Sequence, residues 1–267
     1  MDLALRGKVA VVGGASRGIG FAIARLLAVE GADVAMVARK TEPLAAAVAQ
    51  VAQVAGQNGG RAFALPADIR SAADCERIIG SASEHFGRLD ILVNNDGAPP
   101  LGLLAEFDDA AWQRAIEQNL MSVVRLSRHA LPHLRAAGGG RIVNITALSV
   151  LQPIARFGLS VATWAGVVGY AKTLSLEVAA EAITVNTICP GRIATDRLDM
   201  VYGSGSGAGA AALDDKALAD MARSVPLGRL GTPDEIAGLV SFLASPWGAY
   251  ITGATFHVDG GRGASLV

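Results

Sequence analysis

The stretch Lys8-Val-Ala-Val-Val-Gly-Gly-Ala-Ser-Arg-Gly-Ile-Gly20 decides the fold of this 267-residue chain. It begins as a short β-branched run and continues as a glycine cluster with the spacing Gly-x-x-x-Gly-x-Gly. The next residues, Ile19–Glu30, carry apolar side chains at helical spacing. A strand that turns through glycines into a helix brings free N–H groups and the positive helix end together. The stretch therefore predicts a binding site for a diphosphate.

The rest of the chain repeats this alternation of short apolar runs and helical patterns. We expect strands at Lys8–Gly13, Asp33–Ala38, Arg61–Leu65, Leu89–Asn94, Arg141–Thr146, Ile183–Ile188 and Thr255–Val258. We expect helices at Ile19–Glu30, Leu44–Ala55, Ala72–Phe86, Ala110–Arg135 (bent at Pro132), Phe157–Glu181 and Pro233–Leu243. Apolar strands that alternate with helices form parallel sheets covered on both faces. The pattern predicts an α/β fold with a doubly wound parallel sheet of about seven strands.

One shift in composition interrupts this pattern, at Gly203–Ala212 (GSGSGAGAAA). A linker between two domains is one interpretation, but only about 55 residues follow it. We favour a single domain over residues 1–267, with a mobile lid around residues 192–225 that closes over the site.

Charge and cysteine content exclude several classes of protein. With 23 Lys+Arg against 24 Asp+Glu, the net charge is -1, and no basic field for nucleic acid or for a membrane surface is present. Cys75 and Cys189 are too few for a disulfide framework, and no cluster has metal-ligand spacing. No leader-like segment and no apolar run of about 18 residues is found. We expect a cytoplasmic protein without metal, nucleic-acid or membrane partners.

Several further motifs accompany the glycine cluster in a fixed order. They are Asp68, Asn94-Asn95, Asn119, Pro190-Gly191 and Val258-Asp-Gly-Gly261. From Lys8 to Gly261 the chain resembles the short-chain dehydrogenase/reductase family, and within it the 3-oxoacyl-carrier-protein-reductase-like members. The resemblance implies a single Rossmann-like domain that binds NAD or NADP, acts on a small molecule and forms a dimer or tetramer. The apolar helix Phe157–Val178 also favours a homo-oligomer, and a hetero-oligomer with an intact relative is a further possibility.

The residues after the second expected strand indicate which dinucleotide is bound. An NAD enzyme carries an acid there for the ribose 2′-hydroxyl, whereas this chain has Ala38 followed by Arg39 and Lys40. Cations at this point suit a 2′-phosphate, so we expect NADP(H) to be preferred over NAD(H). With the resemblance, the expected cofactor-binding residues are Gly14, Ser16, Arg17, Gly18, Ile19, Gly20, Arg39, Lys40, Asp68, Ile69, Asn94, Gly97, Pro190, Gly191, Ile193 and Thr195.

Two positions depart from the family pattern beside the cofactor. The family usually has Thr before the first glycine of the motif, where this chain has Gly13, and Ala in the third position of Asn-Asn-Ala-Gly, where it has Asp96. A carboxylate near an anionic cofactor should repel it, unless it accepts a hydrogen bond from a ribose hydroxyl.

The catalytic half departs further from the family. The family uses a Ser, a Tyr thirteen residues later and a Lys four residues after the Tyr; the Lys lowers the Tyr pKa. When the chain is aligned with the family pattern on Asn144-Ile145 and on Leu174–Ala179, the Ser, Tyr and Lys positions are occupied by Ala147, Ser160 and Trp164. A serine hydroxyl is negligibly acidic at neutral pH, and Trp carries no charge. Of the family's catalytic residues only Asn119 is retained, and we expect Asn119, Ser160 and Ser149 to orient the substrate.

Three functions stay open on these grounds. The first is an atypical NADP(H)-dependent oxidoreductase acting on a small carbonyl or alcohol, with the proton supplied by the substrate or by water. The second is a catalytically inactive pseudoenzyme or non-catalytic subunit of a hetero-oligomer. The third is a non-redox enzyme, catalysing elimination or cyclisation on the same fold. The glycine loop supports the first two, and the missing triad supports the last two.

Overall fold

A seven-stranded sheet forms the centre of the protein. The computed structural model describes residues 2–97, 99–202 and 212–265. The strands are β1 (Val9–Val12), β2 (Asp33–Ala38), β3 (Ala62–Pro66), β4 (Ile91–Asn94), β5 (Gly140–Ile145), β6 (Ile183–Pro190) and β7 (Thr255–Val258). They are all parallel, in the order β3-β2-β1-β4-β5-β6-β7. The expected α/β, Rossmann-like, doubly wound sheet is confirmed.

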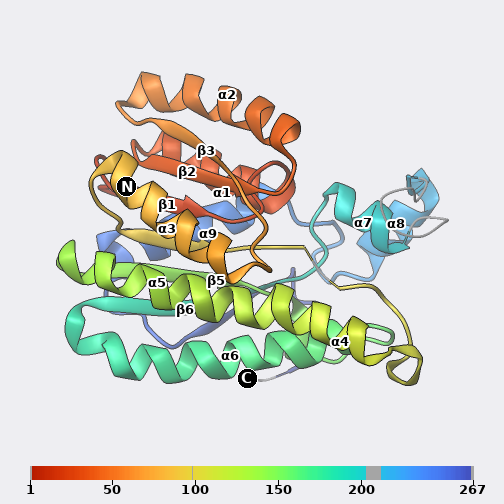
Figure 1. Cartoon of the computed structure of the whole chain (residues 1–267). Helices are drawn as coiled ribbons and strands as arrows, with labels where there is room; N and C mark the ends of the chain where they lie inside the picture. The colour runs from red at the N-terminus through yellow and green to blue at the C-terminus, as the bar shows by residue number, and fades with distance from the viewer. Residues whose placement is uncertain (1, 98, 203–211, 266–267) are drawn as a thin grey trace.

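Helices cover the sheet on both faces (Figure 1). The apolar residues of α1 (Gly18–Val29), α2 (Thr41–Asn58) and α9 (Pro233–Ala244) join one buried cluster. Those of α3 (Ala72–Phe86), α5 (Ser122–Ala136) and α6 (Gly158–Val178) join a second cluster on the opposite face. Shorter elements are α4 (Asp109–Ala115), α7 (Asp196–Tyr202), α8 (Asp215–Arg223) and 3₁₀ turns at Leu104–Glu106, Leu148–Val150, Ala179–Glu181 and Pro246–Gly248.

Strand β1 shows how the sequence produces the two layers. Successive side chains of a strand point to opposite faces of the sheet. Val9 and Val11 accordingly belong to the cluster beneath α3, α5 and α6, whereas Ala10 and Val12 belong to the cluster beneath α1 and α9. Because both faces are covered, all four residues are apolar and buried. A continuous apolar run, rather than an alternating one, is the expected result for such a strand.

The direction of winding reverses at β1, which positions the site. β1 pairs with β2 on one side and with β4 on the other. The connections that follow β1 and β4 therefore run toward opposite edges of the sheet and leave a crevice between them. Such a reversal is where ligands bind in open α/β sheets, beyond the carboxyl ends of the strands. The loop that follows β1 is the glycine cluster.

Local signals located several elements to the residue. β2, α3 and β7 have the predicted bounds. Helix α3 is delimited at both ends, because the Ser71 side chain accepts a hydrogen bond from Asp74 N and Gly87 follows the helix at φ +82°. The prediction that the second helix ends at Ala55 is wrong. Helix α2 continues to Asn58, and Gly59, at φ +83°, is the residue that ends it.

The long helix predicted at Ala110–Arg135 is three elements rather than one. Helix α4 passes into a π-helical turn at Ile116–Met121 and then into α5. Pro132 lies inside α5. The principal irregularity is therefore the π turn, which contains Asn119 and which side-chain periodicity does not reveal.

In the predicted lid region the structure has two helices that the sequence analysis did not predict, α7 and α8. Of the glycine-rich stretch Gly203–Ala212, only Ala212 lies within the described residues. No helix in the described ranges is long and apolar enough to cross a membrane.

The chain covers only part of helix α6 with its own residues. Leu159, Trp164, Val167 and Leu174 are buried, whereas Leu176 is 72% exposed. Exposed or half-buried small and apolar residues continue along the same helix at Val161, Ala165, Val168 and Gly169. Packing within one chain therefore accounts for the buried apolar residues of α6 but leaves its exposed apolar residues uncovered.

We predict that this exposed face of α6 is covered by a second copy in solution, as a dimer or tetramer. Light scattering at micromolar protein concentration measures the mass directly. Leu176→Lys should lower the mass, since a charge would be buried in such an interface. A monomeric mass for the parent protein would contradict the prediction.

Candidate cofactor and substrate site

The glycine loop passes so close to the end of β4 that no side chain fits between them. A Cβ atom on Gly13 would lie 2.5 Å from the backbone oxygen of Asn95, and one on Gly20 would lie 2.4 Å from the backbone oxygen of Gly14. Gly14 and Gly18 have φ angles of +59° and +57°, which favour glycine. The Asn95 amide donates to the Gly13 oxygen over 3.0 Å and holds the two segments together. The replacement of the family's usual Thr by Gly13 is therefore compatible with this approach.

A cavity of about 620 Å³ opens at this point and extends over the carboxyl ends of the strands. Residues predicted to bind cofactor form much of its wall: Gly14, Ser16, Arg17, Gly18, Ile19, Gly20, Arg39, Lys40, Asp68, Ile69, Gly97, Pro190, Gly191, Ile193 and Thr195. Ser149 also lines it. The structure thus brings together segments from several of the loops that follow strands.

Three of the predicted site residues lie behind this wall instead. Asn94 is buried, and its amide donates to Asn144 Oδ1 over 2.8 Å and to Ser127 Oγ over 3.4 Å. Asn119 is buried, and its amide donates to Thr163 Oγ1 over 2.9 Å. Ser160 is 1% exposed. None of the three is among the residues that line the cavity.

The wall beyond β2 carries positive charge. Arg39 and Lys40 are exposed, line the cavity and form no ion pair within the described parts of the chain. The residue at the end of β2, where an NAD enzyme has an acid, is Ala38. This part of the wall can therefore accept a second anionic group beside a ribose.

Asp68, beyond β3, is fixed by its neighbour Arg70. The Arg70 guanidinium donates to both carboxylate oxygens over 2.5–3.1 Å, and it is the main reason that the pKa of Asp68 lies below its usual range. Asp68 N in turn donates to Asp74 Oδ2 at the start of α3 over 2.7 Å. Asp68 is thus a fully charged carboxylate held in one orientation on the cavity wall.

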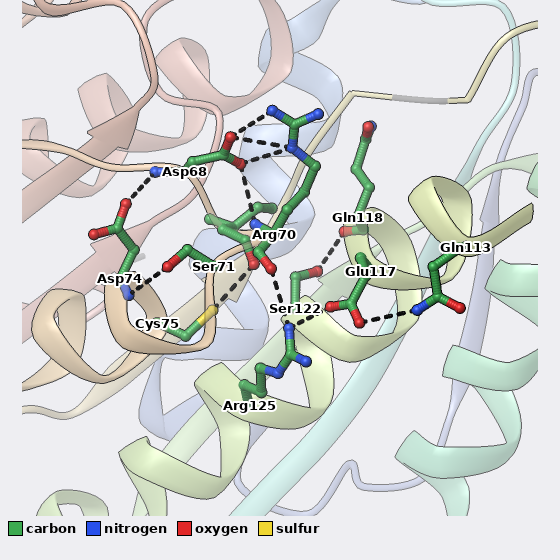
Figure 2. A network of polar contacts seen from close by, with 11 residues as sticks. Asp68, Arg70, Ser71, Asp74, Cys75, Gln113, Glu117, Gln118, Ser122 and Arg125 are labelled. Atoms are coloured by element: carbon green, nitrogen blue, oxygen red, sulfur yellow. Dashed lines mark hydrogen bonds and ion pairs between the residues drawn. The ribbon is translucent and has the colours of Figure 1, made fainter. Parts of the chain in front are cut away.

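A chain of polar contacts ties this loop to the segment that contains Asn119 (Figure 2). The Arg125 guanidinium on α5 donates to the Arg70 backbone oxygen over 3.2 Å and to Glu117 Oε2 over 2.5 Å. Glu117 lies in the π turn, and the next residue, Gln118, lines the cavity. Arg125 therefore sets the spacing between the loop after β3 and the π turn, beyond the carboxyl ends of the strands.

Helix α7 lies over the glycine loop. Arg17 is 3.5 Å from the Asp196 carboxylate, and its guanidinium also contacts Met200 Sδ at 3.9 Å. Arg197, on the same helix, is attracted to the Asp96 carboxylate across the cavity, while burial lowers the pKa of Arg197. The three cations Arg17, Arg39 and Lys40 line one cavity, but Arg17 is engaged with α7.

The wall beyond β5 and at the start of α6 is apolar. Trp164 is 9% exposed and packs against Val123, Val167 and Ala147. Trp164, Ala147, Leu148 and Ser149 all line the cavity. The hydroxyls of Ser149 and Ser160 and the Asn119 side-chain oxygen are buried without a hydrogen-bond partner in the described residues. This wall therefore combines an apolar surface with buried hydroxyl and amide groups.

The residues present fit a phosphorylated dinucleotide. The loop between β1 and α1 has glycines where a diphosphate must approach the backbone, and the cations that follow β2 form no ion pair with any described residue. In the described ranges no group of three or more His, Cys, Asp and Glu residues could hold a metal ion.

Comparison with known proteins agrees with this geometry. Residues 14–262 match the family model described as enoyl-(acyl carrier protein) reductase. The chain is 40% identical to the 3-oxoacyl-(acyl-carrier-protein) reductase FabG of Vibrio cholerae, over 96% of this chain and 98% of that protein. This chain belongs to the short-chain dehydrogenase/reductase family.

Other members of the family are similar over their whole length. The short-chain reductase protein NovJ of Streptomyces niveus is 37% identical, over 95% of this chain and 93% of that protein. The crystal structure of L-sorbose reductase from Gluconobacter frateurii, complexed with NADPH and L-sorbose, superposes with a TM-score of 0.90. It is 33% identical, and the match covers 100% of both chains.

Several polar cavity residues were absent from the predicted site, among them Arg70, Arg197, Tyr202 and Arg262. Arg70 carries a local signal, because it stands two residues from Asp68 and next to a helix cap. The others lie on α7 or after β7, and only the tertiary structure brings them to the cavity.

Asp96 should make the stability of the protein depend on pH. Its side chain is exposed to the cavity, yet the surrounding protein desolvates it enough to raise its pKa to about 6, despite the opposing attraction of Arg39. Because this pKa lies above the unfolded value of about 3.9, the charged form destabilises the folded state above pH 6. That cost disappears as the pH falls from about 6 to about 4.

We expect Asp96→Asn to melt at a higher temperature than the parent at pH 7.5. The difference should shrink as the pH is lowered through 6. Thermal unfolding between pH 4.5 and pH 8 tests this, with Asp109→Asn, exposed on α4, as the control for loss of a carboxyl. A difference of constant size over this range would contradict the assignment.

Proposed function

We propose that this protein binds NADP(H) and acts as an oxidoreductase on a small carbonyl or alcohol substrate. The observation that carries the proposal is the cavity at the reversal of the sheet. There a loop whose glycines allow close approach to the backbone adjoins Arg39 and Lys40, and Ala38 stands where an acid would select NAD. A guanidinium binds phosphate through paired hydrogen bonds, so this wall favours a 2′-phosphate over a hydroxyl.

The relatives support the same class of reaction. The superposed structure is that of a reductase in complex with NADPH and L-sorbose, and the curated relative from Vibrio cholerae is a 3-oxoacyl-(acyl-carrier-protein) reductase. Both names describe reduction. Their substrates are those of the relatives and are not assigned to this chain.

We assign the cofactor-binding roles along the cavity wall. The N–H groups from Gly14 to Gly20 would hold the diphosphate, Arg39 and Lys40 the 2′-phosphate, and Asp68 with Ile69 the adenine. Pro190, Gly191, Ile193 and Thr195 would hold the nicotinamide end, and Asn94 and Gly97 would support the adenosine ribose. When bound, the nicotinamide supplies or accepts the hydride.

The proposed proton path does not use the family's Tyr–Lys pair. We place Ala147, Ser160 and Trp164 at the family's Ser, Tyr and Lys positions. Ser160 is too weak an acid to protonate a substrate oxygen at neutral pH. The proton is then supplied by the substrate or by water, and Ser149, which lines the cavity, orients it. Ser160 and Asn119, which were expected to share this role, are buried behind the wall and do not line the cavity.

A second function, that of a non-catalytic subunit, is favoured by the packing of Trp164. Its indole joins an apolar cluster with Val123 and Val167 at the place where the family has its Lys. A protein of this kind would bind the cofactor and pair with an intact relative. A non-redox reaction, elimination or cyclisation, would use the same wall without hydride transfer.

The preference for NADPH should depend on Arg39. Titration followed by nucleotide fluorescence is expected to show tighter binding of NADPH than of NADH. Arg39→Ala should weaken NADPH by about 1–3 kcal/mol, because a charge-assisted hydrogen bond to phosphate is lost, and should leave NADH unchanged. Arg114→Ala, exposed on α4 outside the cavity, is the control. Equal affinities of the parent protein for the two nucleotides would refute the preference.

Restoring the family's residues should restore its chemistry. Ala147→Ser, Ser160→Tyr and Trp164→Lys together should raise NADPH oxidation with a panel of simple ketones and aldehydes by about 10²-fold or more. Trp164→Lys alone should give no gain and should lower the denaturation midpoint, since it places an unpaired cation among apolar residues. A parent protein that already turns over the panel at about 1–10³ s⁻¹ would show that another group supplies the proton.

A further inference from the structure

A second group of cations lines the cavity, on the side away from Arg39. Arg192 follows β6 and Arg262 follows β7, and these two strands are neighbours in the sheet. Both side chains are half-buried and both line the cavity. Their guanidinium groups repel each other, and this repulsion adds to the burial that lowers the pKa of Arg192.

In the described parts of the chain, no carboxylate neutralises this pair of positive charges. Neither Arg192 nor Arg262 forms an ion pair there. The nearest candidate in sequence, Asp259, accepts hydrogen bonds from Gly261 N over 2.9 Å and Gly263 N over 2.6 Å, and so closes its own turn. Two like charges held together without a counter-ion are costly, and a bound anion would offset that cost.

Arg192 is held in place by neutral groups. One terminal nitrogen donates to the Met221 backbone oxygen over 3.0 Å and to Ser224 Oγ over 2.5 Å, and the guanidinium lies 5.6 Å from the centre of the Tyr202 ring. Its Nε is buried without a partner in the described residues. The side chain is thus ordered and keeps an unused hydrogen-bond donor.

The segment after β7 lies against the loop that follows β5. Ala264 N donates to Gln152 Oε1 over 2.8 Å, and a Cβ atom on Gly263 would lie 3.1 Å from the Leu148 side chain. Arg262 is therefore on the side of the cavity that also carries Ser149 and Trp164. Arg39 and Asp68 lie on the other side of the reversal at β1, beyond β2 and β3.

We propose that the substrate of this protein carries an oxyanion, a carboxylate or a phosphate, that Arg192 and Arg262 bind together. This assignment rests on the proposed function, which gives the opposite end of the cavity to the cofactor. Paired guanidinium groups match the geometry of both anions. The apolar body of the substrate would lie between them and the hydroxyl groups, against Leu148, Ile154, Phe157 and Trp164, which line the same cavity.

The test compares charged ligands with neutral counterparts that have the same carbon chain and carbonyl group. NADP⁺-loaded protein is titrated by calorimetry with 4-oxopentanoate and its methyl ester, and with dihydroxyacetone phosphate and dihydroxyacetone. In at least one pair, the charged ligand should bind about tenfold or more tighter than its neutral partner. The pair that shows this difference in affinity identifies the anion as carboxylate or phosphate. Equal affinities within both pairs would overturn the proposal.

Arg262→Gln then tests the assignment of the site. It should abolish most of the charge preference and leave NADP⁺ affinity unchanged. It should not lower the denaturation midpoint, because it removes one of two repelling charges. Arg114→Gln should change neither the charge preference nor NADP⁺ affinity. Preserved preference in Arg262→Gln would overturn the proposal. If NADP⁺ does not bind but an Arg262-dependent preference is measured in its absence, the cofactor assignment fails and the anion site stands.

Discussion

The close passage of two backbone segments at the carboxyl ends of β1 and β4 is the constraint on which the rest of the structure depends. Gly13 N donates to Val93 O over 3.0 Å, and Asn95 returns a hydrogen bond to the Gly13 oxygen. A side chain on Gly13 or Gly20 would separate the two segments. The crevice of the sheet opens here, so the same glycines set both the closure of the core and the shape of the cavity.

The charge of the residues that line the cavity differs from the net charge of the chain. The chain as a whole carries a net charge of -1, yet Arg39, Lys40, Arg192 and Arg262 line the cavity without ion pairs in the described ranges. Arg39 attracts the carboxylates of Asp68 and Asp96, and Asp68 is already bonded to Arg70. Asp96 is the exception, since its environment disfavours its charge. The cavity is thus arranged for ligands with several anionic groups.

The half of the site beyond β5 presents an apolar wall with a buried polar layer behind it. Ala147, Ser149 and Trp164 stand on the wall, and Asn119 stands behind it in the π turn. Arg125 ties this turn to the loop after β3, so the position of the turn beside the cavity is held by charged contacts (Figure 2). The indole of Trp164 packs against Val123 and Val167 and makes this part of the wall apolar.

The sequence by itself determined the class of fold, the place of the glycine loop and the bounds of elements such as β2, α3 and β7. These rest on short-range physics: side-chain periodicity, a serine cap, and glycines at positive φ. It also indicated the cations after β2, because they directly follow a strand that the pattern identifies.

Only the tertiary structure decided the π turn, the burial of Asn94, Asn119 and Ser160 behind the wall, and the engagement of Arg17 with α7. The pairing of Arg192 with Arg262 belongs to the same class, since the two residues are far apart in sequence. They meet because β6 and β7 are adjacent in the sheet, and strand adjacency is set by how the whole core packs, which no local stretch of sequence encodes.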